Sequence, residues 1–187
     1  METWFCSEKA VKEPDNTFQE KIKFRCIESP FGRYAFVSID GRICAAEFVD
    51  DDGTFIARIK KKMSDMLVEQ KDVVENMSGI TLQSLVGQYA QFDKFILEGT
   101  DFQISVWKAL LRIPLGKCVS YSHVAAMINR PSAVRAVASA IAKNPIAVLV
   151  PCHRVIKSSG DIGEYRWGRA RKKAILHWEK CDKIIKQ

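Results

Sequence analysis

Residues 148–156 have the sequence Val148-Leu149-Val150-Pro151-Cys152-His153-Arg154-Val155-Ile156. The apolar flanks predict a buried strand, because the run is too short for an ordinary helix. Pro151 cannot donate to a strand ladder, so we expect the strand to end or bend there. Cys152 is then left at the edge of a buried element, where a thiol can meet a substrate. The alternative is that Cys152 is a small buried hydrophobe and His153 merely its neighbour.

The composition indicates a globular chain. Its 187 residues are 47% hydrophobic and 10% aromatic, enough for a core. No apolar run is long enough to span a membrane, and the N-terminus lacks the layout of a signal peptide. The six cysteines are scattered without a Cys-x-x-Cys pair, which favours a reducing compartment. We therefore expect a cytoplasmic protein, nuclear if the source is eukaryotic, with no membrane association.

The net charge of +7 is unevenly placed. Residues 101–187 carry sixteen Lys and Arg against five Asp and Glu, whereas residues 1–100 carry thirteen against seventeen. A basic half beside an acidic half favours a polyanionic partner, with nucleic acid first. Solvated helix faces are the alternative, which charge alone leaves open.

The first part of the chain, residues 1–92, is predicted to be a small α+β domain. Residues 35–39 and 43–48 are β-rich and flank Asp40-Gly41, the signal of a hairpin with a type I′ turn. Apolar spacing predicts a helix over 54–70 and another near 80–92. We expect no metal site here, because these residues contain no histidine and a closed zinc site needs four ligands.

The second part, residues 93–187, is predicted to be mostly helical, which makes the whole chain α+β. Thr100 and Gln103 form a capping-box pattern before a helix that ends at Pro114. Ser120 can cap a helix over 121–128, and Pro131 is placed to open the next, through Lys143.

These two helices make a helix-turn-helix candidate at about 121–143. The second helix is nearly free of bulk, since it is rich in alanine. It can therefore approach a sugar-phosphate backbone with Arg135 projecting from its smooth face. Close packing in a protein core is the alternative. A last helix over 169–180 is expected to turn Arg169, Arg171, Lys172 and Lys173 outward.

These motifs resemble the O6-alkylguanine-DNA alkyltransferases, in the form closest to the alkyltransferase half of the bacterial adaptive-response protein. The matching pieces occur in the family's order and span about residues 99–179. They are Gly99-Thr100-x-Phe102-Gln103, Val119-Ser120-Tyr121, Ala133-Val134-Arg135-Ala136-Val137, Asn144-Pro145, Pro151-Cys152-His153-Arg154-Val155, Ser159-Gly160, Gly163-x-Tyr165-Arg166-Trp167-Gly168 and Glu179.

The resemblance implies a DNA repair protein, a methylated-DNA–protein-cysteine S-methyltransferase. Such a protein flips O6-alkylguanine, and also O4-alkylthymine, out of double-stranded DNA and transfers the alkyl group to its own Cys152. The thioether has no evident route back to a thiol, so each molecule acts once. No cofactor is implied. The expected protein is a monomer that binds DNA through the minor groove.

The resemblance also assigns residues to roles. His153 is the base, acting through a water molecule, and Glu179 orients it; Tyr121 donates to the leaving guanine, and Asn144 helps build the base pocket. Arg135 fills the stack that the flipped base vacates. Further DNA contacts are implied for Ser120, Ala133, Ala136 and Arg154. The walls of the substrate pocket are implied to be Ser159, Tyr165, Arg166 and Trp167.

Two other functions compete with this interpretation. A damage-sensing DNA-binding module lacks the nucleophile, and the presence of Cys152 argues against it. A Cys-His hydrolase needs a separately placed histidine, and the chain has only His123, His153 and His177.

Overall fold

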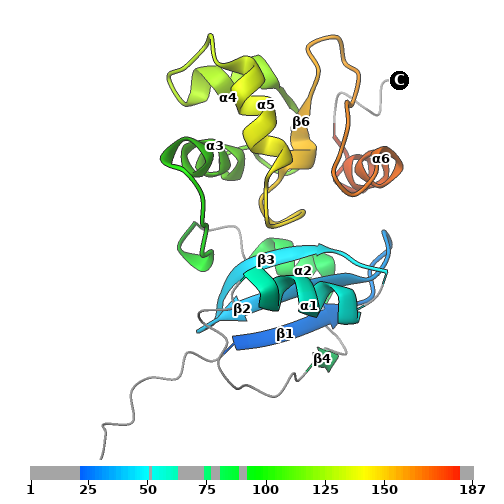
Figure 1. Cartoon of the computed structure of the whole chain (residues 1–187). Coiled ribbons are helices and arrows are strands. Elements are labelled where there is room, and N and C mark those ends of the chain that lie inside the picture. The colour runs from blue at the N-terminus through cyan, green and yellow to red at the C-terminus, as the bar shows by residue number, and fades with distance from the viewer. Residues whose placement is uncertain (1–21, 51, 63–73, 77–80, 89–91, 182–187) are drawn as a thin grey trace, which may run out of the picture.

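A computed structural model describes residues 22–50, 52–62, 74–76, 81–88 and 92–181. The strands are β1 (Ile22–Ile27), β2 (Tyr34–Ile39), β3 (Arg42–Phe48), β4 (Val74–Asn76), β5 (Val119–Ser120) and β6 (Val155–Ile156). The α-helices are α1 (Asp52–Lys62), α2 (Leu82–Gln88), α3 (Asp101–Leu111), α4 (Tyr121–Met127), α5 (Val134–Ala142) and α6 (Arg169–Trp178), and short 3₁₀ helices cover Phe92–Lys94 and Cys152–Arg154. The α+β class is confirmed: a sheet layer lies against a layer formed by α3 to α6 (Figure 1).

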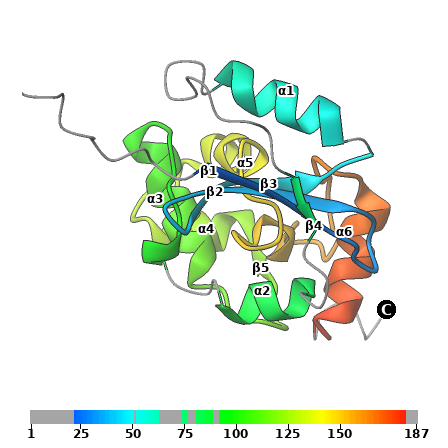
Figure 2. The same cartoon turned by 90° about the horizontal axis from the view of Figure 1, so that it is seen from below.

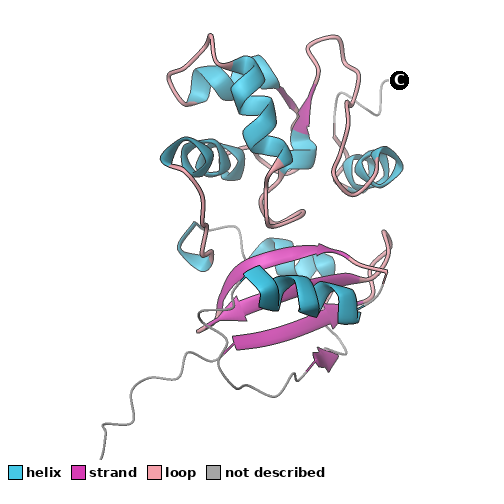
Figure 3. Cartoon of the chain, viewed as in Figure 1, coloured by secondary structure: helices cyan, strands magenta, loops and turns pink. Residues whose placement is uncertain are grey.

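The sheet has the order β3-β2-β1-β4. Strand β2 pairs antiparallel with both β1 and β3, and β4 runs parallel to β1. The predicted hairpin is confirmed, since Asp40 and Gly41 both have positive φ, 48° and 81°, as a type I′ turn requires. The longer strands lie in this layer, and the upper layer is mainly helix and loop (Figure 3).

Every residue of β2 is buried, because both faces of the sheet are covered. Tyr34 and Phe36 pack in the cluster that contains α2 and the upper helices. Ala35 and Val37 pack on the opposite face against α1. Figure 2 shows α1 and α2 on opposite sides of the sheet. The sheet is thus the middle layer of this part of the molecule.

The capping box that starts α3 is confirmed, because the Thr100 hydroxyl accepts a hydrogen bond from the Gln103 backbone N–H and the Gln103 side-chain oxygen accepts one from the Thr100 backbone N–H. Ser120 caps α4 through the His123 backbone N–H, 3.1 Å away. The prediction that Pro131 opens α5 is wrong: the helix starts at Val134, after a turn.

The prediction that Lys172 faces outward on α6 is also wrong. Its side chain is buried, because the Nζ atom donates to the Val155 carbonyl at 2.7 Å. The ammonium group loses its hydrogen bonds to water on burial, and the Val155 carbonyl replaces one of them. Arg169 and Lys173 are exposed as expected, and Arg171 is half-buried.

The segment before Cys152 is buried as predicted, but it is not a strand. Val148 has a φ of 64°, and residues 147–149 form a turn that is followed by a bend at Val150. Asn144 explains the difference, since its side-chain amide donates to the Ile146 and Val150 carbonyls. Hydrogen bonds from the Asn144 side chain thus replace the strand ladder that was expected before Cys152. The extended backbone of this segment is limited to β6, which follows the 3₁₀ helix and pairs parallel with β5.

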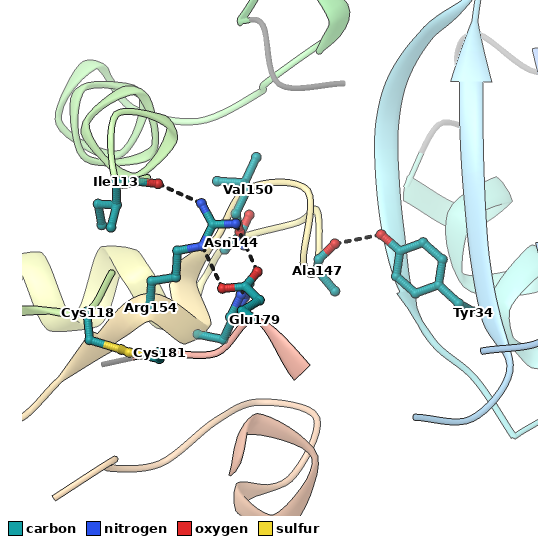
Figure 4. A network of polar contacts seen from close by, with 10 residues as sticks. Tyr34, Ile113, Cys118, Asn144, Ala147, Val150, Arg154, Glu179 and Cys181 are labelled. Carbon is teal, nitrogen blue, oxygen red and sulfur yellow. Dashed lines mark hydrogen bonds and ion pairs between the residues drawn. A yellow bond between two sulfur atoms is a disulfide. The ribbon is translucent and has the colours of Figure 1, made fainter. Parts of the chain in front are cut away.

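The two layers are joined at residues 145–147. The Tyr34 hydroxyl donates to the Ala147 carbonyl at 2.6 Å (Figure 4). Ala46 in β3 donates to the Pro145 carbonyl and accepts from the Ala147 backbone N–H. The chain that leads to Cys152 is therefore anchored on β2 and β3.

Cys118 and Cys181 form a disulfide that closes a sequence separation of 63 residues. This differs from the expectation of reduced cysteines throughout, which rested on sequence spacing, because the fold brings together two residues far apart in the chain. Cys26, Cys44 and Cys152 are not part of this or another disulfide among the described residues. Within the described ranges, none of the helices is both long and apolar enough to cross a membrane.

Candidate active site

Cys152 begins the short 3₁₀ helix after Pro151 and is 5% exposed. The Asn144 amide nitrogen lies 3.1 Å from its sulfur atom. The same amide group holds the Ile146 and Val150 carbonyls, and its oxygen accepts from the Ile146 backbone N–H at 3.0 Å. Asn144 thus fixes both the loop and the thiol that the loop carries.

Two opposing effects act on the thiol. Burial raises the pKa of Cys152, because it disfavours the thiolate, while the hydrogen bond from Asn144 and the positive charge of Lys172 lower it. Burial in turn lowers the pKa of Lys172 to about 8. A cation and an amide donor beside the sulfur therefore offset part of the cost of a buried thiolate.

Behind the thiol lies a buried group of three charged or titratable side chains. The Nε2 atom of His153 is 2.9 Å from Glu179 Oε1, and Arg154 donates two hydrogen bonds to the same carboxylate, also at 2.9 Å (Figure 4 shows the Arg154 part). Burial opposes ionisation of Glu179, but the bonds from His153 and Arg154 outweigh it and lower its pKa to about 2. Glu179 is therefore a carboxylate at neutral pH.

This carboxylate sets the tautomer of His153. An ionised carboxylate only accepts, so Nε2 carries the proton and Nδ1 carries a lone pair. Burial lowers the pKa of His153, although Glu179 acts in the opposite direction. Nδ1 is buried without a hydrogen-bond partner among the described residues. His153 is thus held as a neutral imidazole with a basic nitrogen available.

The assignment of Arg154 to a DNA contact is wrong. Its side chain is 8% exposed, and besides Glu179 it donates to the Ile113 carbonyl at 2.6 Å. The adjacent carboxylate draws the guanidinium inward, where it neutralises a buried charge.

Cys152 opens into a pocket of about 350 Å³. The residues that line it are Tyr121, Ala138, Ile141, Ala142, Cys152, Glu164, Tyr165, Arg166 and Trp167. The Tyr165 and Trp167 rings meet edge to face at 5.1 Å, and the Arg166 guanidinium lies 5.4 Å from the centre of the Trp167 ring. Three of the four predicted wall residues are therefore together at the pocket, whereas Ser159 is exposed and not part of its lining.

Tyr121 lines this pocket at the start of α4. Burial raises its pKa, and the nearby Cys152 acts in the same direction. The phenol therefore stays protonated at neutral pH and can donate. Gly163, with a φ of 68°, leaves room for the Tyr121 hydroxyl, which would lie 3.4 Å from a Cβ atom there.

The outer face of α5 carries the remaining predicted residues. Arg135 and Ala136 are exposed, and Ala133 is half-buried at the N-cap of α5. Ser120 is half-buried, and its hydroxyl is used for capping α4 and for a contact with Ser122. Ala138 and Ala142 from the same helix line the pocket, so α5 connects the exposed surface to Cys152.

Sequence reasoning missed two residues. Lys172 lies in a run of basic residues typical of a solvated helix face, and nothing in the run distinguishes it. Tyr34 lies in a hairpin strand more than one hundred positions before Cys152, so its bond to Ala147 depends on the fold of both layers.

The chain is similar to known DNA repair methyltransferases in sequence and in fold. A family profile described as 6-O-methylguanine DNA methyltransferase, DNA binding domain, matches residues 101–181. The chain is 34% identical over 167 residues to the bifunctional transcriptional activator/DNA repair enzyme Ada of Escherichia coli. This alignment covers 84% of the present chain and 45% of the Escherichia coli protein. The chain is also 43% identical over 122 residues to the inducible methylated-DNA–protein-cysteine methyltransferase of Bacillus subtilis. This second alignment covers 65% of the present chain and 68% of the relative.

A solved structure is also similar along most of the chain. The structure of Mycobacterium tuberculosis OGT in complex with DNA superposes with a TM-score of 0.63 at 34% identity, covering 84% of this chain and 93% of that one. The chain spans about half the length of other curated relatives, with 45% of the Escherichia coli protein and 58% of the Mycobacterium bovis methyltransferase matched.

Proposed function

The chain belongs to the methylated-DNA–protein-cysteine methyltransferase family, and from this premise we propose that it repairs alkylated DNA by accepting the alkyl group on Cys152. The substrates are O6-alkylguanine and O4-alkylthymine in double-stranded DNA. The observation that carries the proposal is the Cys152 thiol, which opens into an aromatic pocket with an amide donor on its sulfur atom.

The thiol must lose its proton before transfer, because the thiolate is the nucleophile. His153 accepts this proton at Nδ1 through a water molecule, and the resulting imidazolium is stabilised by Glu179 at 2.9 Å. Lys172 and Asn144 stabilise the thiolate that remains. Arg154 is a positioning residue, since it keeps the carboxylate ionised and oriented.

In the transfer step, the Cys152 sulfur forms a bond to the alkyl carbon, and the bond between that carbon and guanine O6 breaks. The electron pair of the broken bond stays on the guanine. Tyr121 donates to the purine ring and stabilises this developing charge. The product is restored guanine and a thioether on Cys152, so each protein molecule reacts once.

The target atom lies inside a base stack, so the nucleotide must be flipped out to reach the pocket. We assign this step to α5 in the minor groove, with Arg135 filling the vacated stack and Ala133 and Ala136 allowing close approach. Ser120, the N-cap of α4, is assigned a further contact with the DNA. We also propose a monomeric, cytoplasmic protein with an N-terminal domain over 1–92 and an alkyltransferase domain over 93–187.

The test is a duplex whose O6-methylguanine blocks a restriction site. Native protein should restore cleavage in a one-to-one ratio with duplex, and Cys152→Ser should not restore it at any ratio. Restoration beyond one duplex per protein molecule indicates a turning-over enzyme and contradicts the proposal. Binding without restoration by the native protein indicates a damage sensor.

A further inference from the structure

A second hollow, of about 410 Å³, lies where α1 and β3 meet the end of α5. Its charged lining residues are Arg58, Lys61, Lys143, Arg166 and Glu47, and we call this hollow the basic cleft. We propose that the basic cleft binds the phosphodiester backbone of DNA beside the flipped nucleotide, which brings the sheet layer into the DNA interface. This inference rests on the proposed function.

The basic cleft holds more positive charge than its own carboxylate neutralises. Glu47 is 8% exposed, and it pairs with Arg58 and, at 4.0 Å, with Arg166. One carboxylate therefore serves two guanidinium groups, and Lys61 and Lys143 add two further cations. Burial and the charge of Arg166 both lower the pKa of Arg58, as expected where cations crowd together.

The location identifies the anion. Arg166 lines both the basic cleft and the alkyl pocket of Cys152. Lys143 is the C-terminal cap of α5, whose outer face is assigned to DNA. A nucleotide with its base in the alkyl pocket necessarily carries a phosphate on each side. The basic cleft is the cationic hollow next to that pocket, so a backbone phosphate fits it better than an acidic protein does.

Lys61 is the most informative position, because it is exposed on α1 and has no part in the alkyl pocket. We would compare Lys61→Gln and Lys61→Glu with the parent, all in the Cys152→Ser background, on a duplex with one O6-methylguanine. Lys180→Gln is the matched control, since Lys180 is also exposed but lines a separate hollow with α2 and Trp178.

The readout is the slope of the logarithm of the binding constant against the logarithm of salt concentration. Each lost phosphate contact should reduce its magnitude by about 0.9, so Lys61→Gln should show that change and Lys180→Gln should not. Lys61→Glu should bind several-fold more weakly than Lys61→Gln at low salt.

Parent-like slopes and affinities in both Lys61 variants would overturn the proposal, and so would equal changes in the Lys180 control. Methyl acceptance by the native protein is measured separately. If that acceptance fails while the Lys61 slope changes, the repair function is wrong but the basic cleft still contacts DNA.

Discussion

The Nε2 atom of His153 lies 2.9 Å from Oε1 of Glu179, and both side chains are fully enclosed in the protein. The pair ties Glu179, the C-cap of α6, to the residue that follows the nucleophile. It therefore links the stability of the protein to its chemistry, and each consequence can be measured separately.

The first prediction concerns acid stability. The pKa of Glu179 is lowered from its ordinary value of 4.5 to about 2. Its contribution to the free energy of unfolding is therefore complete above pH 4.5 and is lost as the pH falls from there towards 2. The loss should be at most about 3 kcal/mol. In urea titrations between pH 7 and 3, Glu179→Gln should have a lower free energy of unfolding at pH 7 than the native protein. Its free energy of unfolding should also change less with pH. If the free energies of unfolding of the two proteins ran parallel with pH, the stabilising role assigned to the Glu179 carboxylate would be refuted.

The second prediction concerns Lys172, whose charge lowers the pKa of the Cys152 thiol. Lys172→Met should raise that pKa and slow methyl transfer at pH 7. Because the pKa of Lys172 is about 8, the lysine loses its charge at higher pH and no longer stabilises the thiolate. The methyl-transfer rates of the native protein and the variant should therefore converge there. Lys172→Arg, which keeps the charge, is the control. A uniform loss of rate at every pH would indicate a packing role instead.

The third prediction concerns base flipping. Arg135→Ala should slow repair of duplex DNA by about tenfold or more, since extrusion costs a few kcal/mol. Repair of the free base O6-methylguanine needs no extrusion and should be unchanged. Rates with both substrates are compared for the native protein and the variant. Equal slowing on both substrates would remove Arg135 from this role.

The fourth prediction concerns substrate size. Trp167 is part of the pocket wall and is braced by Tyr165 and Arg166. Methyl groups should fit, whereas a benzyl group should overpack a wall that cannot move, at a cost of about 1–3 kcal/mol. The native protein should resist inactivation by O6-benzylguanine, and Trp167→Gly should be at least about tenfold more sensitive to this inactivation. Rapid inactivation of the native protein would contradict this, as would a variant no more sensitive than its parent.

The sequence predicted the features that depend on local patterns. The Asp40-Gly41 turn and the Thr100 capping box are each specified by a few neighbouring residues. The resemblance contributed a set of pocket residues, of which Tyr165, Arg166 and Trp167 meet at the Cys152 pocket.

Other features depend on contacts between distant residues. The buried Lys172 follows from the Val155 carbonyl, which only the fold brings near its ammonium group. The inward position of Arg154 has the same origin, because Glu179 is 25 positions away in the sequence. Patterns of period 2 or 3.6 carry no information on such partners. The turn before Cys152 has a local cause instead, because Asn144 bonds carbonyl groups two and six positions further on.

The most direct test is the mass of the Cys152 peptide after the native protein has reacted with a duplex that carries O6-methylguanine. We expect one added methyl group on this peptide, up to one per protein molecule, with Cys26 and Cys44 unmodified. Restored guanine without a methyl group on Cys152, or a methyl group on another residue, would contradict it.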